Sequence, residues 1–452
     1  MTTNQNTAWI WTRVRRHAGM LLPLAWPSML SRVGLVVLGT VDTIMVGQFS
    51  TQELAYLSLG NGTFFMIILM ITISLLLGIL VFTAEAYGRE DYKACGRIFH
   101  RSLPVVAVLG LLTALICIPG ETYFLLSGQT EELSRQGGRV MMILGFGLPG
   151  HVIFALAIFF MEGIARPKPV MYGMLAVNIA NVGLNYVLIF GAFGLPALGA
   201  EGSAWATTIL RWLLAGWVLL YLFKSPTFAK FDLWSGITTP WKEWRGQRHL
   251  GYASAVGMGA EVSAFAALNL FSGWLGVVHL AAFGIAFNLM TIPFMLALGI
   301  GSATAVRVGI ARSRGDYLDR AIAGWTGIVA GMILLAFIGA AIVIFVRPVL
   351  ALYTSDPVLV TVALPLFLLT GYVLIFDGGQ AIVANALRGL GETWVPMGIQ
   401  VFSYFGIMIP LSYFLAFPMA HGTVGLFEAT IIASIVSVVL QGIRFQRKAI
   451  GG

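Results

Sequence analysis

The sequence consists almost entirely of long apolar runs separated by short polar segments. Each run is long enough to cross the hydrocarbon core of a bilayer as a helix, which takes roughly 20 residues. Continuous apolar runs exclude a transmembrane β-barrel, whose strands alternate in hydrophobicity over about ten residues. We therefore expect an all-α polytopic membrane protein with twelve spanning helices. These are 18–46, 54–83, 103–127, 139–163, 170–192, 201–223, 251–274, 277–303, 323–346, 359–386, 395–416 and 423–443.

The charge content supports this class. Only 10% of the 452 residues are charged, whereas soluble domains carry about 25%. This excludes a disordered chain and an ordinary cytosolic enzyme. The net charge of +8 would favour a nucleic-acid partner in a soluble protein, but here the bases lie in loops between spans, and we expect none. Cys95 lies in a basic loop and Cys117 in an apolar run, so we expect no structural disulfide.

The distribution of lysine and arginine predicts the orientation. With a cytoplasmic N-terminus, 22 of the 27 basic residues fall in inside segments. Three fall in outside loops, namely Arg135, Arg139 and Arg347. Cytoplasmic loops carry the excess of basic residues. We therefore expect a multi-pass protein with both termini in the cytoplasm, surrounded by the lipid bilayer.

The largest polar interruption, at 224–250, divides the chain into two halves. The expected segments are a cytoplasmic N-terminal segment 1–17, a six-helix bundle 18–223, a basic cytoplasmic linker 224–250, a second six-helix bundle 251–443 and a cytoplasmic tail 444–452.

Short motifs recur in the two halves. Arg89-Glu-Asp-Tyr92 precedes Arg314-Gly-Asp-Tyr317 by 225 positions, and the Gly199 to Thr207 pattern recurs from Gly422 to Thr430 at an offset of 223. Six crossings are an even number, so both halves begin on the same side of the membrane. Duplication therefore predicts two bundles related by a pseudo-two-fold axis along the membrane normal, an arrangement typical of transporters.

Three carboxylates lie well inside apolar runs: Asp42, Glu261 and Asp377. A charged side chain at the centre of a spanning helix costs about 2.5–3.5 kcal/mol on insertion scales, so the acids that are kept indicate function. They could bind a coupling ion, carry a proton or meet a cationic substrate. The alternative is a buried, hydrogen-bonded acid that fixes helix packing.

A row of asparagines occupies the fifth run. Asn178, Asn181 and Asn185 are spaced i, i+3 and i+7, which places them on one helix face. Asp42 with Asn181, Asn185 and the Thr207 hydroxyl would supply the oxygen ligands that a hard cation such as Na⁺ prefers. Asparagine also joins membrane helices by hydrogen bonds, and spacing does not separate these two interpretations.

The other polar residues indicate function less strongly than the carboxylates and the asparagine row. Asn178, Asn269, Asn288 and Tyr372 are polar positions that we expect to line a substrate cavity. The roles of Arg32, Arg211 and Glu428 stay open. The chain lacks the nucleotide-binding motif G-x-x-x-x-G-K-[ST] and the hydrolase motifs H-E-x-x-H and G-x-S-x-G, so we expect neither an enzyme nor a cofactor. Nothing in the pattern requires an oligomer, and we expect a monomer.

Several motifs resemble those of the multidrug and toxic compound extrusion (MATE) family, in its NorM-like branch. The resemblance extends from about residue 20 to 443. Its motifs are Thr40-Val-Asp-Thr-Ile-Met-Val-Gly47, Leu184-Asn185-Tyr186, Gly199-x-x-Gly202-x-x-x-Ala206-Thr207, Glu261, and Asp377 followed by Ala386-Leu387-Arg388-Gly389.

The resemblance implies two six-helix bundles around a V-shaped central cavity. It also implies export of organic cations and amphipathic drugs, in exchange for sodium ions or protons, across a bacterial inner membrane. Asp42, Asn181 and Asn185 match the family's ion-sensitive cluster in the first bundle, and Glu261 and Asp377 match its acidic cation site in the second. Some members carry an acid where this chain has Asn185, which leaves the choice between Na⁺ and H⁺ open.

Three other functions compete with this interpretation. A flippase for lipid-linked precursors, from the same superfamily, would favour basic residues in the cavity and often extra helices. A major-facilitator-type transporter would share twelve helices and a basic central loop but not these motifs. A channel or receptor would give no reason for an internal duplication with paired acids. The flippase is the alternative that we keep.

Overall fold

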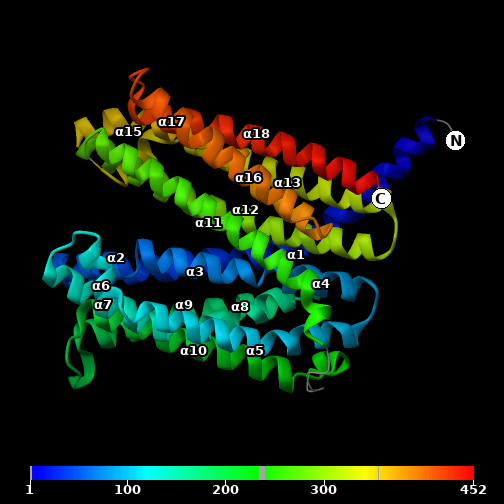
Figure 1. The fold of residues 1–452 in the computed structure, drawn as a ribbon, viewed down its shortest axis with the longest axis horizontal. Helices are drawn as coiled ribbons and strands as arrows, with labels where there is room; N and C mark the ends of the chain where they lie inside the picture. Colours follow the sequence, from blue (N-terminus) through cyan, green and yellow to red (C-terminus); the bar gives the residue numbers. More distant parts are fainter. Residues whose placement is uncertain (1–2, 234–239, 355, 452) are drawn as a thin grey trace. The chain divides into compact units, whose positions relative to one another are not determined.

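A computed structural model of the chain describes residues 3–233, 240–354 and 356–451. The described residues form helices and connecting turns, without a strand among them (Figure 1). Eleven helical segments in this part are long and apolar enough to cross a membrane. A twelfth span results if α7 (Glu131–Phe146) and α8 (Leu148–Gly163), which meet at an angle of 44°, count as one. The expected all-α polytopic fold is confirmed.

The chain divides into two compact units, which we describe separately. The first unit comprises Val33–Gly251, and the second comprises Met1–Arg32 together with Tyr252–Gly452. Helix α1 (Thr3–Phe49) therefore contributes to both units. The first 32 residues group with the second half of the sequence, whereas the sequence analysis assigned 18–32 to the first bundle. The expected bundle boundaries stay a prediction.

The first unit contains the second part of α1 and the helices up to the linker. Its elements, besides α7 and α8, are α2 (Thr51–Gly60), α3 (Thr63–Leu75), α4 (Leu77–Gly88), α5 (Tyr92–Cys117), α6 (Gly120–Leu126), α9 (Lys168–Phe190), η1 (Ala192–Gly194), α10 (Gly199–Lys224), η2 (Pro226–Phe231) and η3 (Trp241–Trp244). The core cluster of this unit includes the buried residues Phe65, Phe124 and Leu148. Cys95 and Cys117 are both free and buried.

The second unit contains the first part of α1 and the helices after the linker. Its elements are α11 (Arg245–Trp274), α12 (Val277–Ser313), α13 (Tyr317–Ile344), α14 (Val346–Ala351), α15 (Pro357–Gly389), α16 (Trp394–Val401), the π-helical segment η4 (Phe402–Met408), α17 (Ile409–Ala416) and α18 (Gly422–Ile450). The first residues of α11, up to Gly251, group with the first unit. A separate core cluster includes Phe283, Phe367 and Leu426.

Several expected runs are interrupted in the structure. The run 54–83 is divided among α2, α3 and α4, and 103–127 contains the end of α5 and then α6. Most of the expected N-terminal segment and tail is helical, since α1 begins at Thr3 and α18 ends at Ile450. The linker holds η2 and η3, and its residues 234–239 lie outside the described residues.

The recurring Arg-x-Asp-Tyr motif has a structural explanation. Its aspartate is the N-cap of the next helix in both places: Asp91 accepts from the amide of Ala94, and Asp316 accepts from the amides of Leu318 and Asp319. A capping carboxylate satisfies amides that lack a partner inside the helix. The residue before each cap is left-handed, with φ of 61° at Glu90 and 74° at Gly315. Glycine takes this conformation without steric cost.

Candidate functional site: two clusters of buried carboxylates

The first cluster surrounds Asp42, in the part of α1 that belongs to the first unit. Asn181 and Asn185, on α9, donate their amide Nδ2 to Asp42 Oδ1 at 3.0 and 2.6 Å. The hydroxyl of Thr207, on α10, donates to Asp42 Oδ2 at 2.6 Å. All four side chains are buried, and Asp42 is 7% exposed. Two helices, α9 and α10, thus place three donors on one carboxylate of α1.

This donor set suits an ionised carboxylate, because both oxygens accept hydrogen bonds and such bonds are stronger when charge-assisted. Asn185 also donates to Asn181 Oδ1 at 3.3 Å. The Oδ1 of Asn185 is buried without a hydrogen-bond partner among the described residues. Rotation of the Asn185 side-chain amide by half a turn would place its oxygen, an acceptor, where its nitrogen, a donor, now lies. The same side chains can therefore face a negative charge or present oxygens to a cation.

A positive charge lies near this cluster. Arg211 is one helical turn beyond Thr207 on α10, and its charge acts on Asp42 without an ion pair within 4 Å in the described part of the chain. Its Nη1 donates to the carbonyl of Leu144 at 3.3 Å, and its Cζ lies 5.4 Å from the ring centroid of Phe65. Arg211, whose role the sequence left open, thus supplies a positive field rather than a direct partner.

The second cluster surrounds Asp377, on α15 in the second unit. Its Oδ1 accepts from the Tyr404 hydroxyl and from the Ser434 hydroxyl, both at 3.3 Å. Glu261, on α11, interacts electrostatically with Asp377 and with Tyr404. Asp377 and Glu261 are 3% and 7% exposed. Tyr404 therefore joins the two acids that the sequence analysis paired.

A chain of amides and hydroxyls extends this second cluster. Gln380 donates to the Tyr404 hydroxyl and accepts from Ser437 at 2.6 Å. Gln441 in turn donates to Ser437 at 2.9 Å. The charge of Arg388, in the last turn of α15, also acts on Glu261. Such connected networks are stronger in a low-dielectric interior than the same bonds in water.

Sequence reasoning missed the partners in this network. Gln380 is one turn from Asp377, and Ser434, Ser437 and Gln441 share a helix face by their spacing of i, i+3 and i+7, so periodicity could have found them. Tyr404 gave no such signal. It lies in the π-helical segment η4, and π turns, which change the facing of a side chain, are frequent at functional sites.

The remaining sequence candidates do not join either cluster. Asn178 donates to the carbonyl of Met174 at 2.8 Å. Asn269 and Tyr372 are exposed, and Asn288 is exposed and accepts from Tyr353 at 3.3 Å. Their place in a substrate cavity stays a prediction. Of the residues left open, Arg32 donates to Ser302 at 2.6 Å, and Glu428 pairs with His421 at 2.7 Å.

Helices that span the membrane, with buried carboxylates in each of two units, define the class of the protein as a polytopic membrane transporter. The family model MatE matches residues 27–187 and 253–414, one segment in each half of the sequence. This match covers more than half of the chain. The chain belongs to the MatE family, and it is a transport protein rather than an enzyme.

Individual relatives agree with this assignment. The chain is 33% identical over 427 residues to a protein of Caulobacter vibrioides named "Probable multidrug resistance protein NorM", covering 94% of this chain and 90% of that protein. It is 28% identical to multidrug resistance protein PmpM of Pseudomonas aeruginosa, over 97% and 93% of the two chains. A crystal structure of MATE in the straight conformation superposes with a TM-score of 0.88 at 17% identity, over 96% of each chain. This last likeness shows the fold.

Proposed function

We propose that this protein is a multidrug efflux transporter that exports organic cations and amphipathic drugs in exchange for Na⁺ or H⁺. Its family and the names of its relatives support the drug-efflux part. The observation that carries the coupling part is the burial of Asp42 under three hydrogen-bond donors. A buried charge without a direct ion-pair partner is expensive, and Arg211 acts on Asp42 only from beyond ion-pair distance. Binding of a cation or a proton at Asp42 therefore stabilises the site.

Coupling requires that ion and drug favour different states of the protein. In the scheme that we propose, an ion from outside binds at Asp42 or at the Glu261 and Asp377 pair. Ion binding lowers the affinity for the drug, which leaves to the outside. On the inside, drug replaces the ion. By linkage, the drug must lower the affinity for the ion by the same factor.

The two clusters would respond to the ion in different ways. At Asp42, a proton would neutralise the carboxylate, whereas Na⁺ would require an amide such as that of Asn185 to turn its oxygen inward. At the second cluster, the Tyr404 hydroxyl donates to Asp377 and also interacts with Glu261, and one hydroxyl can donate to only one acid at a time. The ionisation of Asp377 therefore affects that of Glu261, because the same hydroxyl proton can stabilise only one of the two carboxylates.

We further propose that the protein is a monomer in a bacterial inner membrane with both termini in the cytoplasm. The Lys and Arg distribution supports the orientation, and the bacterial sources of the relatives support the location. The membrane potential assists any step that moves net positive charge inward, by about 2.3 kcal/mol per charge per 100 mV.

The test is efflux of a fluorescent organic cation from proteoliposomes, with Na⁺ and pH gradients imposed separately. Wild type runs beside Asp42→Asn, Asp377→Asn and Glu261→Gln. Glu131→Gln, which neutralises an exposed acid in the first turn of α7, is the control. We expect gradient-driven export in wild type and control and its loss in the site variants. Normal export by a site variant would remove that acid from the mechanism.

The driving gradient identifies the ion. Export driven by Na⁺ alone would make the oxygen clusters sodium sites, and export driven by pH alone would make the acids proton carriers. If neither gradient drives export, the drug-efflux proposal fails. A labelled lipid-linked precursor would then be the next substrate, as the flippase alternative requires.

A further inference from the structure

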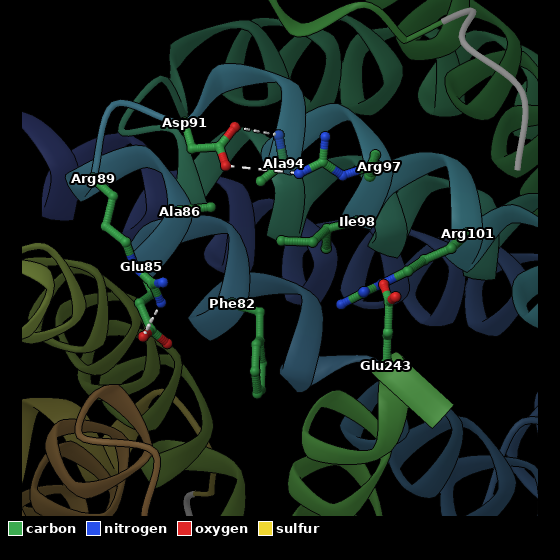
Figure 2. Close-up of a pocket in the computed structure, with 10 residues that line it drawn as sticks. All are labelled: Phe82, Glu85, Ala86, Arg89, Asp91, Ala94, Arg97, Ile98, Arg101 and Glu243. Atoms are coloured by element: carbon green, nitrogen blue, oxygen red, sulfur yellow. Dashed lines mark hydrogen bonds and ion pairs between the residues drawn. The ribbon is translucent and has the colours of Figure 1, made fainter. Parts of the chain in front are cut away.

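A small polar cavity lies away from both carboxylate clusters, inside the first unit (Figure 2). Its volume is about 230 Å³, and side chains from α4, α5 and η3 line it. Pockets for drug-sized ligands usually measure about 300–1,000 Å³. The cavity is therefore too small for a drug and fits a small polar group.

The charges of the cavity balance. Its basic residues are Arg89, Arg97 and Arg101, and its acids are Glu85, Asp91 and Glu243. Two pairs form within it: Arg89 binds Glu85, and Arg97 lies 3.7 Å from Asp91. An electrically neutral lining with both signs favours a ligand that also carries both signs, because each of its charges finds a partner.

Arg101 is the residue that points to a ligand. It is 8% exposed, and only its Nε is bonded, to Gln247 Oε1 at 2.9 Å. Its two terminal nitrogens make no hydrogen bond or ion pair within the described residues, and they face the cavity (Figure 2). A guanidinium presents a planar fork that matches phosphate oxygens. A guanidinium fork that lines the cavity without a hydrogen-bond partner marks an anion subsite.

An acidic counterpart stands across the same space. Figure 2 shows the Glu243 side chain extending into the cavity that Arg101 enters. Glu243 is exposed, and its carboxylate makes no hydrogen bond and no ion pair within 4 Å among the described residues, although its backbone amide donates to the carbonyl of Pro240 at 3.0 Å. The charge of Glu243 acts on Arg101, and Arg101 Cζ also lies 5.9 Å from the ring centroid of Trp244, but the two charged groups form no ion pair within 4 Å among the described residues. The cavity thus offers one cation and one anion that are not paired directly, which is the complement of a phosphate joined to an amine.

The cavity also lies at the level where lipid headgroups are found. It opens between the end of the candidate span Thr51–Gly88 and the start of Tyr92–Cys117. Headgroups lie at the ends of spanning helices. Phe82 and Ile98 add apolar lining beside the charges, as expected at a boundary between acyl chains and water.

The duplication supplies a comparison. The second unit has the equivalent turn at Asp316, and there the place is filled by the chain itself. Arg13 lies 2.7 Å from Asp316, and Arg16 and His17 lie 2.5 and 2.9 Å from Asp319, all from α1.

In the first unit, Asp91 forms an ion pair only with Arg97 of α5 among the described residues. Lys230 of η2 lies 3.8 Å from the ring centroid of the neighbouring Tyr92 and forms no ion pair with Asp91. Basic side chains of α1 fill the space at the Asp316 turn, whereas the space at the Asp91 turn forms part of the cavity.

We propose that this cavity binds the headgroup of an amine-bearing phospholipid of the phosphatidylethanolamine type. Arg101 and Arg97 hold the phosphate, and Glu243 accepts from the ammonium. The site is independent of the coupling clusters, so it stands or fails separately from the proposed transport activity.

The test is native mass spectrometry of the full-length protein in detergent, titrated with phosphatidylethanolamine, phosphatidylglycerol or inorganic phosphate. We expect tighter binding of phosphatidylethanolamine than of phosphatidylglycerol, which has the phosphate but no amine. Arg101→Gln and Arg97→Gln should each weaken phosphatidylethanolamine binding about tenfold, the size of one charge-assisted hydrogen bond. Arg15→Gln, which removes an exposed positive charge on α1, should have no effect.

Glu243→Gln tests the ammonium contact separately from the phosphate contact. It should weaken the binding of phosphatidylethanolamine and leave the binding of phosphatidylglycerol unchanged. Glu131→Gln should change the binding of neither lipid. Equal effects on both lipids would overturn the ammonium contact, and wild-type affinity in Arg97→Gln and Arg101→Gln would overturn the site. Displacement of the lipid by millimolar inorganic phosphate, without preference for either lipid, would assign the cavity to free phosphate. Arg97 is half exposed, so its variant keeps the test valid if Arg101→Gln fails to fold.

Discussion

At the scale of single residues, each buried acid is defined by the donors around it. Asp42 accepts from three side chains on two other helices, and Asp377 accepts from two. A partner removed from a buried hydrogen bond leaves the remaining group unsatisfied. Substitution of the donors therefore tests each site without changing its formal charge.

Asn185→Ala removes the shorter of the two amide contacts with Asp42, at 2.6 Å. A hydrogen bond to a charged group contributes about 1.5–3 kcal/mol, so we expect gradient-driven efflux to fall at least tenfold while membrane insertion is retained. Initial efflux rates in proteoliposomes at matched protein content measure this. Gln129→Ala, which removes an exposed side-chain amide before α7, is the control. Equal rates in the two variants would contradict a role for Asn185.

Tyr404→Phe removes the hydroxyl that joins Asp377 to Glu261 and also orphans the amide of Gln380. We expect the free energy of unfolding to fall by about 1–3 kcal/mol and the pH profile of efflux to move. Thermal unfolding in detergent and efflux over a pH series measure the two effects. Tyr413→Phe, an exposed tyrosine on α17 with aromatic neighbours, should change neither. An unaltered pH profile in Tyr404→Phe would reduce the hydroxyl to a structural contact.

At the scale of elements, the turn before α13 is held by charge as well as by its cap. The amide of Asp319 donates to Asp316, and Arg13 from α1 pairs with it, so the pKa of Asp316 lies below its usual value of 3.8. A carboxyl whose pKa is lowered by folding contributes stability above its unfolded pKa. That contribution is lost as the pH falls through the lower, folded pKa.

Asp316→Asn keeps a capping side chain but removes the charge. We expect a lower Tm than wild type at pH 7 and a difference that shrinks as the pH falls below about 3.8. Differential scanning fluorimetry across this range gives the comparison. Asp356→Asn changes another N-cap, at α15, that has no ion pair within the described residues, and it serves as the control. A difference in Tm that stays constant with pH would rule out the charge as its source.

Some elements could be predicted from the sequence and others could not. The positions of the spanning helices were predicted from long apolar runs, because the length of the hydrophobic stretch decides whether a helix can cross the bilayer. The break between α3 and α4 at Leu76 has no such signature. The break between α2 and α3 falls at Asn61-Gly62, a dipeptide typical of turns, which the length of the apolar run concealed. Helical spacing grouped Asn181 with Asn185, and their association with Asp42 was predicted from the oxygen ligands that a cation requires and from the family resemblance. Tyr404 was not predictable, because the π turn that directs it leaves no periodic pattern.

At the scale of the whole molecule, duplication explains more than the number of helices. The family model matches each half once, and the capped turn recurs at Asp91 and Asp316. The copies have diverged in what occupies that turn and in the acids they bury. Asp42 lies in the first unit, and Glu261 and Asp377 lie in the second. A duplicated transporter thus retains one architecture with two different carboxylate sites.

The orientation of this molecule is a prediction that cysteine labelling can test. Cys95 and Cys117 are buried, so the wild type gives a low background with a membrane-impermeant maleimide. Arg135 and Arg15 are both exposed and belong to predicted outside and inside segments. In intact cells, we expect Arg135→Cys to react and Arg15→Cys to react only after permeabilisation, because the basic segments stay in the cytoplasm. The reverse pattern would invert the topology. Reaction of both variants in intact cells would place Arg15 and Arg135 on the same side of the membrane. An even number of spans, and not the predicted three, would then separate these two positions.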